Sequence, residues 1–416
     1  MVFANGPHHV CCVEDRGLFT LYDWAKKERK NVDIHMDKVS YIQYNEHSCI
    51  LAVCYRGDSS QFIVQLYIDV RSDGPRLVGE LKFPNPVLQL VLRNEYMCVV
   101  FEESVLVYSI PNLHLLRNQP TFTNPGSSCC ALSMEVPKIV LACLGMQRGT
   151  VRIERFSSPP SSSVIAAHDT GIVSIGISGN GLLVATASER GTLIRVHSTF
   201  DDCALLYEIR RTSIPILNTR NPKRDIQSLF LSPNGSFLAS LTYTGEISAF
   251  KLTSGTPGSS QLISSTDTRS FSKLYNRYIS PLTSTSPWFS LRVPKTANSS
   301  SKIHAQFGTV PFTLLVTVDS NLFIYRFDGG DANKIVLSRC DRIQASTDDS
   351  ISGEDADIVP HSTKDEPGHD TPDWVVLNDG PDEIFPNHST SPQQFWYSSS
   401  DPDSLQYCHL PPNIPI

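Results

Sequence analysis

No apolar run in this chain is long enough to cross a membrane. The longest apolar stretches have the length of Pro311–Val316, whereas a spanning helix needs roughly 20 consecutive apolar residues. The segment Met1–Asp15 has no basic flank followed by an apolar core, so the sequence predicts no secretory leader. Several of the 11 cysteines lie inside apolar runs, as Cys49, Cys98 and Cys143 do. Such cysteines are typical of the reduced core of a cytoplasmic protein.

Motifs that carry catalysis or hold a metal are also missing. The sequence has no Gly-x-Ser-x-Gly elbow and no Walker loop, and Gly179–Gly181 lacks the third glycine of a dinucleotide fingerprint. His168 and Asp169 are adjacent and cannot orient as a catalytic pair does. The run His8–Cys12 has no second ligand pair at zinc spacing. We therefore predict a protein that is not an enzyme and needs no metal and no cofactor.

Charge is distributed unevenly along the chain. Residues 338–416 contain 15 Asp and Glu against 3 Lys and Arg, which leaves 32 basic and 27 acidic residues in the body. The acidic segment is rich in Ser, Asp and Pro and poor in aliphatic residues, so we predict a disordered tail over 338–416. A mildly basic body suits an anionic surface. Basic residues interleaved with aromatic residues are too scattered along the body for the sequence to predict a nucleic-acid partner.

The body contains an internal repeat. Residues 172–196 align with residues 226–250 at a constant offset of 54. Five residues of the first copy are identical in the second. Those of the first copy are Ser178, Asn180, Gly181, Ala185 and Gly191, and they align in this order with Ser232, Asn234, Gly235, Ala239 and Gly245. Each copy reads as three short strands joined by an Asn-Gly turn and a Gly-containing turn. The segment 213–223 is predicted to be an inserted loop that lengthens the repeat.

Similar strand pairs recur along the body. They lie at Val10–Tyr22, Val39–Tyr55, Phe62–Ile68, Val87–Ser109, Ile139–Phe156 and Leu314–Phe327. Antiparallel units spaced roughly 40–50 residues apart indicate propeller blades. We therefore predict an all-β, WD-repeat-like, seven-bladed β-propeller over residues 1–337. The chain starts within a strand-like segment, so we expect the closing blade to be incomplete or the sequence truncated.

One edge of this fold has the residue types of a phosphate site. Thr186 and Ser188 precede the Gly191-Thr192 step, and Arg195 follows it. Arg210-Arg211 come after fourteen intervening residues. Arg donates through a planar fork that matches phosphate oxygens. Successive strand residues point to opposite faces, so the paired arginines are predicted to serve two neighbouring pockets. The alternative is that these arginines form surface ion pairs between blades.

These residues closely resemble the signature of the PROPPIN propellers, called WIPI proteins in animals, whose motif is Phe/Leu-Arg-Arg-Gly. The resemblance extends through Gly17–Tyr22, Lys82–Val87, Ala166–His168 and Trp288–Leu291. It implies a seven-bladed propeller that binds phosphatidylinositol 3-phosphate and 3,5-bisphosphate and recruits autophagy proteins during autophagosome assembly. It also implies a cytoplasmic protein attached peripherally to phagophore or endosomal and lysosomal membranes.

The resemblance assigns two lipid pockets. The first is complete, and its residues are Thr186, Ser188, Gly191, Thr192, Arg195 and Arg210. The residues at the positions of the second pocket are Arg211, Thr212, Thr242, Glu246 and Ser248. Three of them depart from the family, which has a glycine in place of Thr212, a threonine in place of Glu246 and a histidine in place of Ser248. A carboxylate repels phosphate, and each lost donor removes roughly 1.5–3 kcal/mol when its partner is charged. The second pocket is therefore predicted to be degraded.

Residues 254–287 are a candidate membrane-inserting loop. Five apolar residues follow a helical spacing, with basic residues on the other side, and they are Phe271, Leu274, Tyr275, Tyr278 and Ile279. The family places its membrane-inserting loop at this point. The alternative is a short helix that packs its aromatic stripe onto the propeller.

The acidic tail contains a short candidate motif. Asp373, Trp374 and Leu377 resemble the acidic aromatic-x-x-aliphatic motif that binds ubiquitin-like autophagy modifiers by β-augmentation. In relatives, an Asn and an Asp near the first blade contact an autophagy lipid-transfer protein, and the corresponding residues here are Ala4 and Gly6.

Two functions remain open at this point. One is a phosphoinositide effector, and the other is a propeller scaffold that has lost lipid binding and acts through protein contacts.

Overall fold

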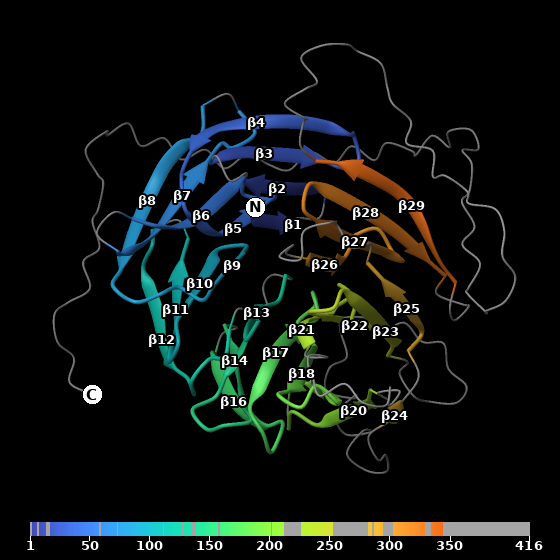
Figure 1. The fold of residues 1–416 in the computed structure, drawn as a ribbon. Coiled ribbons are helices and arrows are strands. Elements are labelled where there is room, and N and C mark those ends of the chain that lie inside the picture. The colour runs from blue at the N-terminus through green and yellow to red at the C-terminus, as the bar shows by residue number, and fades with distance from the viewer. Residues whose placement is uncertain are drawn as a thin grey trace, which may run out of the picture.

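The computed structural model of the chain describes residues 2–343 except for 6–7, 14–16, 58–59, 73, 111, 127, 135–138, 157–158, 201, 212–225, 253–281, 285–286, 294–302 and 329–333. The elements of these residues are all strands, arranged as seven sheets around a central axis (Figure 1), and every strand pair is antiparallel except that of β20 and β24. None of these described residues forms a helix long and apolar enough to cross a membrane. The seven-bladed, all-β propeller predicted from the sequence is confirmed.

The first four blades follow one another along the chain, and each has four strands. Blade 1 contains β1 (Val2–Asn5), β2 (His9–Val13), β3 (Leu18–Asp23) and β4 (Glu28–His35). Blade 2 contains β5 (Val39–Asn45), β6 (Ile50–Arg56), β7 (Phe62–Ile68) and β8 (Arg76–Phe83). Blade 3 contains β9 (Gln89–Arg93), β10 (Tyr96–Val100), β11 (Ser104–Ser109) and β12 (Leu115–Pro120). Blade 4 contains β13 (Cys130–Leu132), β14 (Val140–Leu144), β15 (Thr150–Arg155) and β16 (Ser161–Ala166).

The last three blades contain the candidate site and the ring closure. Blade 5 contains β17 (Ile172–Ile177), β18 (Leu183–Ser188), β19 (Leu193–Ser198) and β20 (Leu205–Arg210), with β24 (Leu282–Ser284) as a fifth strand. Blade 6 contains β21 (Ile226–Leu231), β22 (Phe237–Thr242), β23 (Glu246–Lys251) and β25 (Phe289–Arg292). Blade 7 contains β26 (Ile303–Phe307), β27 (Thr313–Val318), β28 (Asn321–Phe327) and β29 (Ile335–Arg342), so its last strand continues past residue 337.

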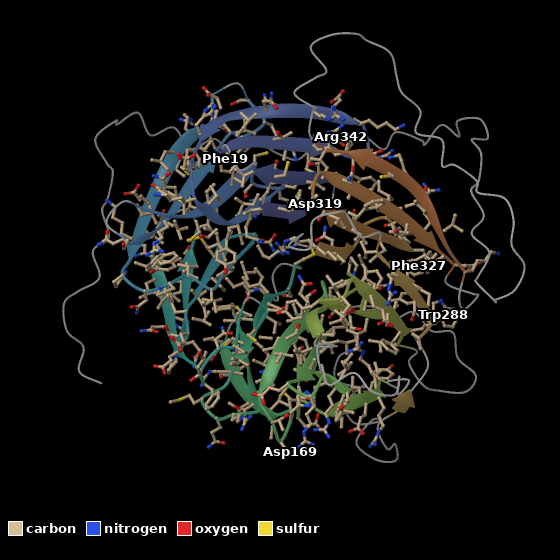
Figure 2. The ribbon with its side chains drawn as sticks, in the orientation of Figure 1. Phe19, Asp169, Trp288, Asp319, Phe327 and Arg342 are labelled. Carbon is tan, nitrogen blue, oxygen red and sulfur yellow. The ribbon has the colours of Figure 1, made fainter. Side chains whose placement is uncertain are left out.

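The position of a strand within its blade determines how its residues are buried. Every residue of β14 and of β22 is buried, because the neighbouring blades cover both faces of these middle strands. The outermost strands β4 and β12 are mostly exposed. The apolar residues therefore form one cluster at each contact between blades. Between blades 6 and 7 this cluster contains the packed rings of Phe237, Phe289, Phe307 and Phe327, of which Figure 2 labels Phe327.

The internal repeat seen in the sequence is a repeat of blades. The strands β17 and β18 begin 54 residues before β21 and β22. In both blades a serine hydroxyl donates to an asparagine in the first turn, at 2.7 Å for Ser178 and Asn180 and at 2.8 Å for Ser232 and Asn234. The first turns of blades 5 and 6 thus have the same side-chain hydrogen bond. This explains why serine and asparagine recur at these positions, because the same turn conformation favours the same residues.

The ring closes between blades 7 and 1 without exchange of a strand. The innermost strand of blade 1 is β1, so the expectation of an incomplete closing blade is wrong. Arg29 donates to the carbonyl of Arg342 at 2.6 Å, and Arg339 donates to the carbonyl of Trp24. Beneath these bonds, a shared apolar cluster contains Phe3, Val10, Cys12, Tyr22, Trp24, Leu315, Leu322, Ile324 and Ile343. Closure thus relies on packing and on side chain to backbone bonds.

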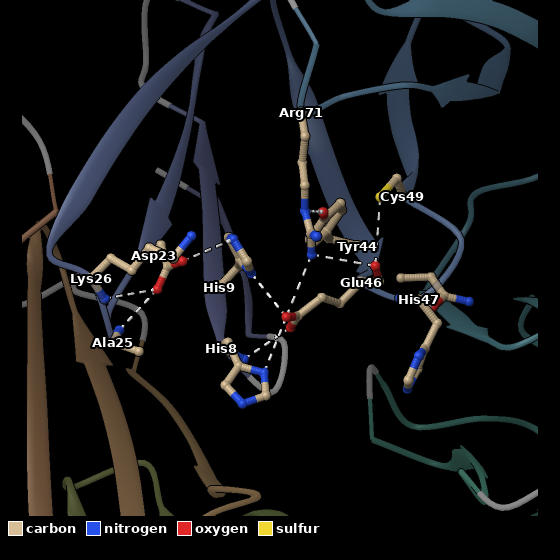
Figure 3. A network of polar contacts seen from close by, with 11 residues as sticks. His8, His9, Asp23, Ala25, Lys26, Tyr44, Glu46, His47, Cys49 and Arg71 are labelled. Atoms are coloured by element: carbon tan, nitrogen blue, oxygen red, sulfur yellow. Dashed lines mark hydrogen bonds and ion pairs between the residues drawn. The ribbon is translucent and has the colours of Figure 1, made fainter. Parts of the chain in front are cut away.

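A polar network joins blades 1 and 2 near the axis (Figure 3). The carboxylate of Glu46 accepts from the backbone N–H of His8 at 2.9 Å, lies 3.1 Å from Nδ1 of His9 and lies 3.4 Å from Nη2 of Arg71. Burial raises the pKa of the Glu46 carboxyl, but the hydrogen bonds from His9 and His8 outweigh it and lower the pKa to about 2. The ionised carboxylate therefore stabilises the fold at neutral pH.

We predict that Glu46→Gln lowers the free energy of unfolding at pH 7 by about 1–3 kcal/mol, because it leaves Arg71 and the histidines without their anion. A lowered pKa stabilises the fold above the unfolded-state pKa, and this contribution is lost as the pH falls toward 2. The difference between variant and wild type in urea unfolding should therefore shrink below pH 4. Asp33→Asn, at a side chain that is 81% exposed, is the control. Equal effects of the two changes would contradict this role of Glu46.

Candidate functional site

The residues of the first predicted pocket lie on three neighbouring strands of blade 5. Thr186 of β18 pairs with Arg195 of β19, and Arg195 pairs with Glu208 of β20. Gly191 and Thr192 form the turn between β18 and β19, and Gly191 has a φ of 64°, a conformation that favours glycine. The turn and the end of β20 lie at the same edge of the blade, since the strands are antiparallel. The fold therefore brings Arg210 to the turn, as the pattern predicted.

Two arginines of the pocket converge on one carboxylate. Glu208 accepts from Nε of Arg195 at 3.2 Å and from Nη2 of Arg210 at 2.9 Å. Burial raises the pKa of Glu208, but the hydrogen bonds from Arg210 and Arg195 outweigh it and hold the pKa below its usual value. The side chain of Arg210 is 66% exposed, whereas that of Arg195 is 25% exposed. The pocket thus presents an accessible guanidinium beside a partly buried one.

The hydroxyl of Thr186 is fully buried and already has partners. Its Oγ1 lies 3.0 Å from Nε2 of His168 and donates to the carbonyl of Arg195 at 3.4 Å. Arg195 also donates to the carbonyl of Ala167 at 2.6 Å. Ser188 is buried, and Thr192 is exposed on the turn. In this structure Thr186 supports the strand of Arg195, and its predicted contact with a phosphate stays a prediction.

Arg211 lies one residue beyond the end of β20. Its backbone N–H donates to the carbonyl of Thr192 at 2.9 Å, and its Nη1 donates to the carbonyl of Gly191 at 3.1 Å. Both bonds reach the turn of blade 5. The guanidinium of Arg211 therefore contacts the turn of blade 5, and its predicted role in a second pocket stays a prediction.

Two hydroxyl residues of the second pocket, Thr242 and Ser248, have partners within blade 6. Thr242 is buried, and its hydroxyl contacts Oγ1 of Thr244 at 2.8 Å and accepts from the backbone N–H of Glu246 at 3.1 Å. Ser248 is buried, and its hydroxyl lies 3.3 Å from that of Ser290. These contacts stabilise the turn and the sheet of the blade.

A short strand from another part of the chain borders the first pocket. Three residues of β24 pair in parallel with Tyr207, Glu208 and Ile209 of β20, and Figure 1 shows β24 beside β20. The chain reaches β24 after β23 and then returns to blade 6 as β25. The edge of the arginine-bearing strand is thereby covered.

Several predicted residues lie outside the described part of the chain. These are Thr212, Gly6, the loop residues Phe271, Leu274, Tyr275, Tyr278 and Ile279, and the tail residues Asp373, Trp374 and Leu377. Ala4 belongs to β1, but its side chain is not described.

The fold and its basic edge define a seven-bladed β-propeller with a candidate anion-binding site on one blade. The PROPPIN family model matches residues 72–287, more than half of the chain. The chain belongs to the PROPPIN family. It is 29% identical over 259 residues to Autophagy-related protein 18e of Arabidopsis thaliana, covering 62% of this chain and 64% of that protein. Autophagy-related protein 18 of Dictyostelium discoideum is 28% identical over 176 residues, covering 42% of this chain and 44% of that protein. The chain thus matches less than two thirds of the length of these relatives.

Solved structures share the fold at low sequence identity. Kluyveromyces lactis Hsv2 superposes with a TM-score of 0.60 at 15% identity, covering 82% of this chain and 98% of that one. KlAtg21, solved in complex with the coiled coil of AgAtg16, superposes with a TM-score of 0.61 at 18% identity, also covering 82% and 98%. These similarities support the blade assignment.

Sequence reasoning missed Glu208 and His168 as parts of the pocket. Glu208 precedes Arg210 by two residues, so the period of a strand places both side chains on one face. That signal was present in the sequence. His168 reaches Thr186 from the connection between blades 4 and 5, and only the arrangement of the two blades reveals the contact.

Two buried histidines next to the pocket are kept neutral. Burial lowers the pKa of His168 to about 4, and burial likewise lowers the pKa of His197 to about 4. Both side chains are less than 10% exposed. Protonation therefore favours the unfolded state below the usual histidine pKa of about 6.5.

We predict that the protein loses about 2 kcal/mol of unfolding free energy per histidine between pH 7 and pH 5. The unfolded chain binds protons in this window and the folded chain does not, so stability falls as the pH falls. Urea unfolding at both pH values measures the loss. The variant His168→Gln/His197→Gln should show a much smaller pH dependence than the wild type. A pH dependence equal to that of the wild type would rule out these two groups as its source.

Proposed function

We propose that this protein is a phosphoinositide effector that binds phosphatidylinositol 3-phosphate and 3,5-bisphosphate through blade 5 and recruits autophagy proteins to the membrane. The observation that carries the proposal is the convergence of Arg195 and Arg210 on the Glu208 carboxylate. Two guanidinium groups that converge on one anion are also arranged to donate to phosphate oxygens. Membership of the PROPPIN family and relatives named as autophagy-related proteins support the proposal.

The attachment and the partners follow from the same proposal. We propose a protein that is cytoplasmic and binds peripherally to phagophore or endosomal and lysosomal membranes. Residues 254–287, apart from the strand β24 that pairs with β20, are the proposed membrane-inserting loop. An autophagy lipid-transfer protein and a ubiquitin-like modifier bound through Trp374 are the proposed protein partners. The structural relative KlAtg21 was solved with a coiled coil of AgAtg16, and a coiled-coil partner for this chain is a proposal of the same kind.

A scaffold without lipid binding is the second candidate function. It is favoured by the second pocket, where the hydroxyls of Thr242 and Ser248 have partners within blade 6 and Glu246 adds a negative charge. Flotation with vesicles that contain or lack phosphatidylinositol 3-phosphate separates the two functions. A scaffold would stay unbound to both kinds of vesicle.

We expect Arg210→Ala to weaken binding to vesicles with phosphatidylinositol 3-phosphate by tenfold or more, which corresponds to about 1.4 kcal/mol. The exposed guanidinium of Arg210 is the accessible donor of the pocket. Arg211→Ala should weaken binding less, because Arg211 contacts the carbonyl of Gly191. Arg76→Ala, at a side chain that is 70% exposed on blade 2, is the matched control. Equal losses for Arg210→Ala and Arg211→Ala would show that the second pocket still binds lipid.

We also expect Glu208→Gln to strengthen binding to the same vesicles by roughly fivefold, or about 1 kcal/mol. The carboxylate occupies guanidinium N–H groups that a phosphate needs, and its charge repels the incoming dianion. Flotation at fixed salt measures the change. Asp69→Asn, which breaks the ion pair with Arg76 on blade 2, is the control. Weaker binding by Glu208→Gln would mean that the carboxylate is needed to position the arginines.

A further inference from the structure

The two most exposed large apolar side chains of the described residues lie on equivalent turns of blades 4 and 6. Met146 is 66% exposed on the turn between β14 and β15, and Tyr243 is 68% exposed on the turn between β22 and β23. The corresponding turn of blade 5 contains Gly191 and Thr192 of the candidate lipid pocket. Because the blades are antiparallel and consecutive around the ring (Figure 1), the three turns lie on the same face.

The turns of blades 4 and 5 are in direct contact. Arg148 lies two residues after Met146, and its Nη2 donates to Oε2 of Glu189 at 2.6 Å. Phe122, which is 39% exposed, donates its backbone N–H to the carbonyl of Gly145 at 2.7 Å. A second exposed apolar side chain therefore stands next to the turn of Met146.

Both turns are held by internal hydrogen bonds. Thr150 donates its hydroxyl to the carbonyl of Gln147 in the turn of Met146. In the turn of Tyr243, the hydroxyls of Thr242 and Thr244 are in contact, and the N–H of Gly245 donates to the carbonyl of Thr242 at 3.0 Å. The exposed tips are thus presented on ordered backbone, which reduces the entropy lost when they bind a surface.

Basic side chains lie between the two apolar tips. Arg148 and Arg210 have side chains that are 54% and 66% exposed, and Arg190 is exposed on the turn of blade 5. Apolar tips on either side of exposed arginines suit an anionic lipid surface, in which arginines contact phosphates while apolar groups enter the headgroup boundary. Tyrosine is enriched at this boundary because its ring is apolar and its hydroxyl is polar.

We propose that Met146 and Tyr243 are interfacial anchors that enter the headgroup region of a phosphoinositide membrane on either side of the Arg210 pocket. The proposal rests on the proposed lipid binding and deepens it. One headgroup contact gives only reversible attachment, and stable attachment takes a second signal that acts through effective concentration. The two tips supply such a signal from the rigid propeller itself, in addition to the proposed loop.

The test uses the full chain with the double variant Met146→Ser/Tyr243→Ser. Binding is measured to phosphatidylcholine vesicles with phosphatidylinositol 3-phosphate, and separately to soluble inositol 1,3-bisphosphate by calorimetry. The matched control is Met134→Ser/Val164→Ser, in which the two side chains are 39% and 59% exposed on other surfaces of blade 4. Tyr243→Trp is a conservative variant that keeps an interfacial ring. Circular dichroism and the melting temperature verify that each variant folds.

We expect the double variant to lose vesicle affinity by about tenfold or more and to bind the soluble headgroup as the wild type does. The control pair and Tyr243→Trp should keep vesicle binding. Unchanged vesicle binding by the double variant would contradict the anchoring role of Met146 and Tyr243. It would leave the proposed lipid binding by the pocket unaffected. Loss of headgroup binding would also contradict the anchoring role, because the tips would then act on the pocket. If the wild type binds neither vesicles nor headgroup, the proposed function fails and the anchors fail with it.

Discussion

The structure depends on the burial of both faces of the middle strands in every blade. A sheet such as β13–β16 cannot cover its own β14, and only neighbouring blades on both sides can do so. Polar bonds then fix how the blades meet near the axis. The hydroxyl of Ser174 lies 3.1 Å from that of Ser128 in blade 4 and accepts from the N–H of Leu229 in blade 6 at 2.9 Å. The turns that form the candidate site are therefore placed by the whole ring.

Much of the fold could be predicted from the sequence, because the repeat at an offset of 54 reflects equal turns and equal strand lengths. The edge that holds Arg195 and Arg210 was also predictable, since strand pairing follows from the turn between β18 and β19. Contacts across blades could not be predicted, because they depend on distances between segments far apart in the chain. The contact of His168 with Thr186 and the pairing of β24 with β20 belong to this group. The bond of the Arg211 guanidinium to the carbonyl of Gly191 was not predictable either, because it depends on the conformation of the turn.

The electrostatics of the site follow from its intramolecular anion. Glu208 compensates part of the charge of Arg195 and Arg210, so the pocket is stable without a ligand although two guanidinium groups lie close together. Two guanidinium groups paired with a carboxylate cost less free energy to desolvate than two guanidinium groups without one. The same carboxylate lowers the positive potential around the two guanidinium groups. An anion at the proposed site would have to compete with Glu208 for the guanidinium N–H groups.

The pairing of β24 with β20 also bears on association between molecules. An uncovered outer strand presents unpaired N–H and C=O groups that can template a strand from another chain. Among the described sheets, those of the other six blades end in a single outer strand such as β4 or β12. In blade 5 the covering strand blocks this kind of pairing next to Arg210. A polypeptide that adds a strand to this sheet must therefore pair with β24 rather than with β20, which keeps it one strand away from the arginine edge.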